Sequence, residues 1–185
     1  MAMFMNGAQG GMITADNRDL NRPRDALRGY WHDDRTWAEC ERIGRLLAAE
    51  SLRLLGKASW QRAPALSVRS RMVKLPVESK EMWMVVQHSP HNADRTVETR
   101  LNVVNLGNAQ MLTIPGEALP NIGMYLKRKM KAEHTFLLGL TNDAFGYILT
   151  KVDFHSFGRY DYVSRVSLGE MTGEILINNA LELIE

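Results

Sequence analysis

The sequence predicts an α/β fold in which helices cover a mixed β-sheet, and three observations support this prediction. Amphipathic helical patterns alternate with short apolar strand patterns along the chain. A strand, a helix and a second strand follow one another through short links between residues 110 and 147. The 185 residues, of which 45% are hydrophobic and 24% charged, are enough for one domain with its own core.

The clearest helix is predicted from Thr36 to Leu55. Thr36 and Glu39 form a capping-box pattern, in which each side chain can accept a hydrogen bond from a free backbone N–H group. The apolar residues that recur at helical spacing are Cys40, Ile43, Leu46, Leu47 and Leu54. Gly56 is expected to end the helix in a left-handed conformation. This apolar stripe predicts that the helix covers a sheet.

Residues 1–35 are expected to form an irregular lead-in to an α/β unit that spans residues 36–185. The apolar stub at residues 3–5 runs directly into a glycine-rich turn, which predicts the end of a buried strand. A strand is predicted at residues 66–75, where basic and apolar residues alternate, and Pro76 ends it. Residues 81–87 fit either a strand or a short helix.

The second half of the chain carries the strand, helix and strand pattern. The predicted elements are a strand at 97–106, a turn at Gly107 and Asn108, a strand at 110–114, a helix opened by residues 114–117 and running to about Lys131, a buried strand at 135–140, and a terminal helix at 170–184. In open α/β sheets, chemistry gathers at the C-terminal ends of the strands. Two such ends are predicted, at residues 115–117 and at residues 140–147.

Glu117 and Tyr147 lie at these two strand ends. Glu117 is expected to start a helix, where free N–H groups would hold its carboxylate. From its position alone, Glu117 could be an ordinary glutamate at a helix start, a metal ligand or a general base. Tyr147 follows a glycine in a polar loop, so it is either a packing residue with one hydrogen bond or a phenolate ligand whose pKa a cation lowers. None of the five histidines forms a ligand set with Glu117 by spacing.

Composition excludes several classes of function. The net charge is +2, with 23 basic and 21 acidic residues, so no nucleic-acid or membrane-surface partner is indicated. We find no apolar run long enough for a transmembrane segment and no signal-peptide pattern at the N-terminus. The single cysteine, Cys40, excludes an internal disulfide. The sequence indicates neither an oligomeric state nor a compartment.

Three segments carry a family resemblance. They are NGAQGGMITAD at residues 6–16, TIPGEALPNIG at residues 113–123, and LGLTNDAFGYILTKVDFHSFGRY at residues 138–160 with the Asp161 that follows. In order and spacing they resemble the neutral/alkaline non-lysosomal ceramidases and their bacterial relatives. The resemblance covers nearly the whole chain, and it implies the C-terminal portion of a larger ceramidase-type catalytic domain.

The resemblance implies roles for four residues. In that family two histidines, a glutamate and a tyrosine bind one zinc ion, and Glu117 and Tyr147 stand at the positions of the glutamate and the tyrosine. Thr14 stands at the position of a catalytically important serine. Tyr160 stands at the position of a second tyrosine beside the scissile amide. The implied reaction is zinc-dependent hydrolysis of the N-acyl amide of ceramide-like lipids to a fatty acid and a sphingoid base.

The sequence also departs from the family pattern. The family's zinc histidines lie upstream of residues 6–16, so this chain is expected to supply two of four ligands and to be inactive when isolated. A non-catalytic remnant or interaction domain is one alternative. A hydrolase of the same fold acting on another amide or ester is a second, because the aspartate and proline around Thr14 are replaced. The resemblance further implies a secreted or periplasmic setting.

Overall fold

The computed structural model describes residues 4–12, 36–88, 94–156 and 158–185. The chain divides into two compact units, and each is described by itself below. One unit comprises residues 1–13 and 63–185, and the other comprises residues 14–62. No helix among the described residues is long and apolar enough to cross a membrane.

The smaller unit contains helix α1 (Trp37–Leu55). The Thr36 half of the predicted capping box is confirmed, because the Thr36 hydroxyl accepts a hydrogen bond of 3.2 Å from the Glu39 N–H group. The Glu39 carboxylate bonds to Arg42. Gly56 was expected to be left-handed, and this is wrong: its φ is −63°. The N–H group of Gly56 bonds to the Leu52 carbonyl at 3.0 Å, which continues the helical turn. No residue of α1 is buried, so its contact with a sheet stays a prediction.

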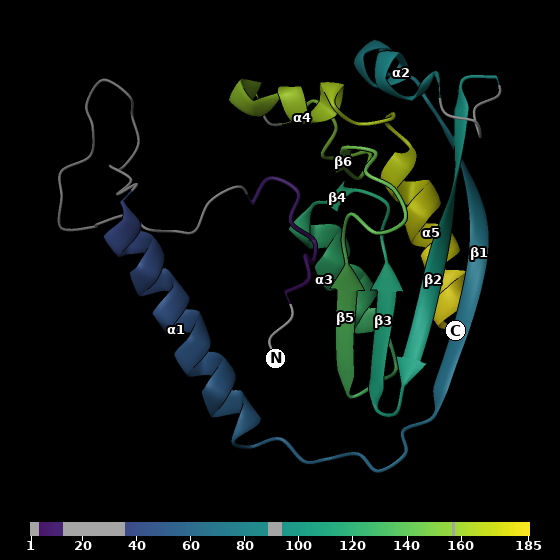
Figure 1. Cartoon of the computed structure of the whole chain (residues 1–185). Helices are drawn as coiled ribbons and strands as arrows, with labels where there is room; N and C mark the ends of the chain where they lie inside the picture. The colour runs from purple at the N-terminus through teal and green to yellow at the C-terminus, as the bar shows by residue number, and fades with distance from the viewer. Residues whose placement is uncertain (1–3, 13–35, 89–93, 157) are drawn as a thin grey trace. The chain divides into compact units, whose positions relative to one another are not determined.

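The larger unit is built on a four-stranded mixed sheet with the order β1-β2-β3-β5, which confirms the predicted fold class (Figure 1). The strands are β1 (Leu66–Pro76), β2 (Thr96–Leu106), β3 (Ala109–Thr113) and β5 (His134–Leu138). The β1–β2 and β2–β3 pairs are antiparallel, and β3 pairs with β5 in parallel. The predicted turn joins β2 to β3, and Gly107 permits it by adopting a φ of 57°.

Helices α3 (Pro120–Lys129) and α5 (Thr172–Ile184) pack together on one face of this sheet (Figure 1). The core between them and the sheet contains fully buried aliphatic side chains, among them Leu75, Leu101, Leu112, Leu126 and Leu176. The ambiguous segment forms a helix, α2 (Lys80–Val86). Ser79 caps α2, because its hydroxyl accepts a hydrogen bond of 3.1 Å from the Met82 N–H group.

Two predictions about element boundaries and burial are wrong. Helix α3 begins at Pro120 and not at residues 114–117, because Glu117 and Ala118 form a short strand, β4 (Glu117–Ala118). Strand β5 is not fully buried, since it lies at the edge of the four-stranded sheet and Phe136 is 43% exposed. In the stub that was expected to end a buried strand, Phe4 is 86% exposed and Met5 is 44% exposed, while residue 3 lies outside the described residues.

Candidate metal centre

Glu117 and Tyr147 lie directly opposite each other in a second, two-stranded parallel sheet. This sheet consists of β4 and β6 (Tyr147–Ile148). Its register pairs Glu117 with Tyr147 and Ala118 with Ile148. Paired residues of adjacent strands carry their side chains on the same face of the sheet. The structure therefore brings together the two residues that the sequence singled out separately.

Backbone hydrogen bonds hold the segments around these residues together. The Glu117 N–H group donates to the Gly146 carbonyl at 2.8 Å, and the Leu119 N–H group donates to the Ile148 carbonyl at 3.0 Å. Before β4 and β6, the Thr141 N–H group bonds to the Ile114 carbonyl at 3.0 Å. As predicted for parallel strands, the segments that follow β3 and β5 meet at one edge.

Two glycines allow this close approach. A Cβ atom on Gly116 would lie 2.6 Å from the carbonyl oxygen of Gly146, closer than real Cβ contacts. Gly146 itself adopts a φ of +73°, a conformation that favours glycine. A side chain on Gly116 would push β4 away from the residue that precedes β6, and a side chain on Gly146 would collide with the Val166 carbonyl. The residues directly before Glu117 and Tyr147 are therefore glycines for a steric reason.

The loop that leads to Tyr147 is anchored to β2 by side chains. The hydroxyl of Thr99, which is buried, donates a hydrogen bond of 2.5 Å to the Asp143 carboxylate. The side-chain amide of Asn142 donates to the Arg100 carbonyl at 2.6 Å. Asn142 has a φ of 76°, which asparagine tolerates better than most residues. These bonds fix the path of the loop before it enters β6.

Tyr147 is 9% exposed, and its hydroxyl lies 3.5 Å from the hydroxyl of Tyr162. The two rings meet edge to face, with centroids 5.7 Å apart. The pKa of Tyr147 is raised above its ordinary value, first by the hydrogen bond with Tyr162, then by burial, and then by the negative charge of Glu117. Without a cation, the Tyr147 phenol therefore stays protonated.

Glu117 is half-buried, and its charge acts on the Tyr147 phenol. Its side chain has no hydrogen-bond or ion-pair partner among the described residues. The Glu117 carboxylate without a donor and the Tyr147 phenol oxygen, whose residue is paired with Glu117 in the register, are two oxygen ligands that a cation could use. A cation in contact with both oxygens would lower the pKa of Tyr147, because it favours the phenolate.

The other two predicted site residues stay predictions. Thr14 lies outside the described residues. Tyr160 lies in the 3-10 helix η1 (Gly158–Tyr160), where it is 57% exposed. Tyr162, in α4 (Tyr162–Arg165), has its hydroxyl 3.5 Å from that of Tyr147. Sequence reasoning missed Tyr162, although tyrosines on both sides of Asp161 made it a visible candidate.

The donor set fits part of a zinc site. Zinc accepts carboxylate oxygen together with nitrogen and sulfur ligands, and its protein sites need at least three ligands. Glu117 and Tyr147 provide two oxygen atoms that could bind the ion. Within the described ranges, no three His, Cys, Asp or Glu side chains gather to hold a metal ion. The pair is therefore compatible with zinc, and further ligands would have to complete the site.

Comparison with known proteins supports the fold. No protein-family model and no curated protein matches the chain. Among solved structures, neutral ceramidase from Pseudomonas aeruginosa is similar with a TM-score of 0.62 and 12% sequence identity. The similarity covers 90% of this chain and 34% of that chain. A ceramidase complexed with C2 is similar over 49% of this chain and 14% of that chain, with a TM-score of 0.42 and 15% identity.

The chain thus has the fold of part of a neutral ceramidase, which confirms the expected resemblance at the level of the fold. It spans about a third of the length of the solved structure that it matches along most of its own length.

Proposed function

From this shared fold, we propose that the chain contributes the glutamate and tyrosine half of the zinc site of a ceramidase-type amidohydrolase. The substrate class that this implies is an N-acyl amide of a ceramide-like lipid. The observation that carries the proposal is the register of β4 and β6, which pairs Glu117 with Tyr147. This pairing of two residues thirty positions apart supports joint binding of one ion.

Each residue has a role in this proposal. Glu117 supplies a carboxylate oxygen, and Tyr147 supplies a phenolic oxygen that gives up its proton on metal binding. Tyr162 positions the Tyr147 ring through the contact between their hydroxyls. Zinc, when bound, supplies a Lewis acid and an activated water for attack on the amide carbonyl. Two histidines, which the family places upstream, would complete the ligand set.

Calorimetric zinc titration of the purified chain tests the metal-binding part of the proposal. We expect weak binding by the wild-type chain, and an affinity about tenfold lower in Glu117→Gln and in Tyr147→Phe, as follows from losing one of few ligands. Glu170→Gln is the matched control, because Glu170 is exposed and lies outside β4 and β6. Equal heats for the wild-type chain and Glu117→Gln would refute the proposal.

The catalytic part needs the histidines. A polypeptide carrying the family's histidine segment should raise the zinc affinity of the chain when added, and the mixture should release fatty acid from an N-acyl sphingoid lipid. Glu117→Gln should lose this release and Glu170→Gln should keep it. Hydrolysis that persists in Glu117→Gln would contradict the assigned role.

A non-catalytic role is the second candidate, and one observation favours it. The described residues bring together two oxygen ligands but no third ligand for a metal ion. A scaffold that has lost the metal would keep the sheet and bind no zinc, with or without added histidines. Absence of zinc binding in the complemented mixture would therefore favour an interaction domain.

A third candidate function is a zinc-dependent hydrolase of the same fold that acts on another amide or an ester. The replaced residues around Thr14 motivate it, since they differ from the family pattern near the serine position. A panel of N-acyl lipids and simple esters, scored for released fatty acid by the complemented mixture, separates it from the ceramide-like assignment. Release from esters but not from the N-acyl lipids would establish this third function.

A further inference from the structure

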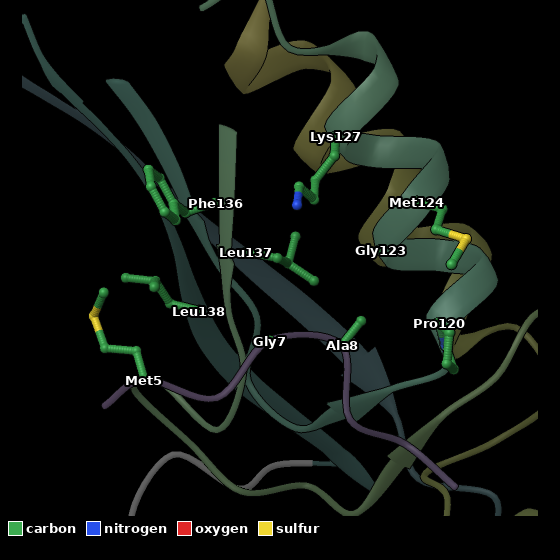
Figure 2. Close-up of a pocket in the computed structure, with 10 residues that line it drawn as sticks. All are labelled: Met5, Gly7, Ala8, Pro120, Gly123, Met124, Lys127, Phe136, Leu137 and Leu138. Carbon is green, nitrogen blue, oxygen red and sulfur yellow. The ribbon is translucent and has the colours of Figure 1, made fainter. Parts of the chain in front are cut away.

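An apolar pocket of about 420 Å³ lies between α3, β5 and residues 5–8, and neither Glu117 nor Tyr147 lines it. Figure 2 shows its walls, which come from three separate stretches of the larger unit. The residues that line it are Met5, Gly7, Ala8, Pro120, Gly123, Met124, Lys127, Phe136, Leu137 and Leu138. Its volume is within the range of about 300–1,000 Å³ typical of small-molecule sites.

The pocket is assembled by close backbone packing. A Cβ atom on Gly123 would collide with the Cβ atom of Ala8, so the glycine lets residues 7–8 lie against α3. The segment is also fixed at both of its ends. The Gly139 N–H group bonds to the Asn6 carbonyl at 2.9 Å, and the Gly10 N–H group bonds to the Ala118 carbonyl at 2.8 Å. These bonds make the wall a defined part of the fold.

Lys127 is the charged residue of the lining, and the other nine are apolar residues or glycines. In Figure 2 the Lys127 side chain extends from α3 into the space above Leu137, with its nitrogen toward the pocket. Among the described residues, no carboxylate forms an ion pair with Lys127. An ammonium group without a partner above an apolar floor complements a ligand with one anionic end and one apolar chain.

We propose that this pocket binds a medium- or long-chain carboxylate, with the carboxylate at Lys127 and the alkyl chain along Phe136, Leu137 and Met124. The lining does not include Glu117, Tyr147 or Tyr162, the residues of the proposed zinc site. The pocket would hold an acyl chain in the form of its free carboxylic acid. The methylene groups leave water for an apolar surface, and the lysine selects the charged end.

Binding can be measured by NMR of the ¹⁵N-labelled chain titrated with decanoate, decanol and decylamine below their aggregation concentrations. We expect decanoate to shift the amide signals of Gly123, Leu137 and Leu138, and to bind about fivefold more tightly than decanol. Across hexanoate, octanoate and decanoate, the affinity should rise about threefold for each methylene that the pocket covers. Decylamine should bind more weakly than decanol.

Three variants test the lysine. Lys127→Met should remove the preference for decanoate over decanol, and Lys127→Arg should keep most of it. Lys131→Met is the matched control, because it makes the same change at an exposed lysine outside the pocket. It should leave the preference unchanged. Zinc titration of Lys127→Met should match that of the wild-type chain, so failure of this site and failure of the zinc site are distinguishable.

Specific outcomes would overturn the proposal. Equal affinities for decanoate, decanol and decylamine would show that Lys127 does not select the ligand. An unchanged preference in Lys127→Met would do the same. Shifts that spread to exposed apolar residues of α2, such as Met84 and Val85, would show adsorption to apolar surface instead of pocket binding. Signals that respond to an acidic apolar peptide but not to decanoate would replace the small-molecule site with a docking site for protein.

Discussion

The carbonyl oxygen of Val166 accepts the Tyr147 N–H group at 2.8 Å and also occupies the place where a Cβ atom on Gly146 would lie. One backbone atom therefore fixes the candidate ligand Tyr147 and excludes a side chain from the residue before it. The chain can enter β6 in this way because Gly146 is a glycine with a φ of +73°.

Gly146→Ala should destabilise the fold by roughly 3 kcal/mol, the sum of a left-handed backbone conformation and displacement of the Val166 carbonyl. Gly158→Ala is the matched control, because Gly158 has a φ of +50° and no atom within 4 Å of its Cβ position. That variant should lose only about 1 kcal/mol. Urea unfolding measures both free energies. Equal losses would show that the contact with Val166 has no cost.

Tyr147→Phe should change how stability depends on pH. Because the folded protein raises the pKa of Tyr147, the stabilisation is fully present below the ordinary tyrosine pKa of about 10 and is lost as pH rises through the folded value. The free energy of unfolding should therefore fall more steeply above about pH 10 in the wild-type chain than in Tyr147→Phe. Urea titrations across this pH range check it, and parallel curves would contradict it.

Tyr162→Phe should lower the pKa of Tyr147 toward its ordinary value, because the Tyr162 hydroxyl is the largest cause of the upward shift. The variant should also lose about 1 kcal/mol of stability, typical of one hydrogen bond. Phenolate absorbance measures the titration, and the double variant Tyr162→Phe with Tyr147→Phe isolates the contribution of Tyr147. An unchanged Tyr147 titration would show that the contact between the hydroxyls is not a hydrogen bond.

Thr99→Val should destabilise the chain by about 2 kcal/mol, because it leaves the Asp143 carboxylate without the hydroxyl that donates to it. Thr99→Ser keeps the hydroxyl and is the control, with an expected loss of less than about 1 kcal/mol from the missing methyl group. Thermal unfolding separates the two variants. If Thr99→Val were as stable as Thr99→Ser, the bond would not anchor the loop.

Leu126→Ala should cost about 3 kcal/mol, because Leu126 is fully buried under the sheet and its removal leaves a cavity. Met124→Ala on the same helix should change stability by less than about 0.5 kcal/mol, because Met124 is 61% exposed. Urea unfolding of both variants tests whether α3 packs on the sheet through the side that carries Leu126. Similar losses would contradict the packing of α3.

Periodic patterns predicted the sheet and its covering helices well, because alternation and helical spacing follow directly from which side chains face the core. The start of α3 was predicted too early, although Pro120 at its first turn marked the true start. Residues 81–87 were ambiguous in periodicity, and the capping serine Ser79 settles them in the structure. Residues at helix starts, here Pro120 and Ser79, thus indicated where the helices begin, which apolar patterns alone did not.

The candidate site was predicted in its parts but not in its geometry. Glu117 and Tyr147 could be singled out from two strand ends and a family pattern. The register that pairs them could not be predicted, because two-residue strands have no periodicity and are held by bonds between distant segments. Tyr162 was missed for the same reason, since its contact with Tyr147 depends on where α4 packs.

The topology has a consequence for the order in which the molecule assembles. Strands β2 and β3 are joined by a tight turn, so they can pair early through local contacts. Parallel strands cannot close through a tight turn, and β4 meets β6 only after the intervening α3 and β5 are in place. We therefore expect Glu117 and Tyr147 to come together late in folding, so slow docking of α3 would delay the site without altering its final form.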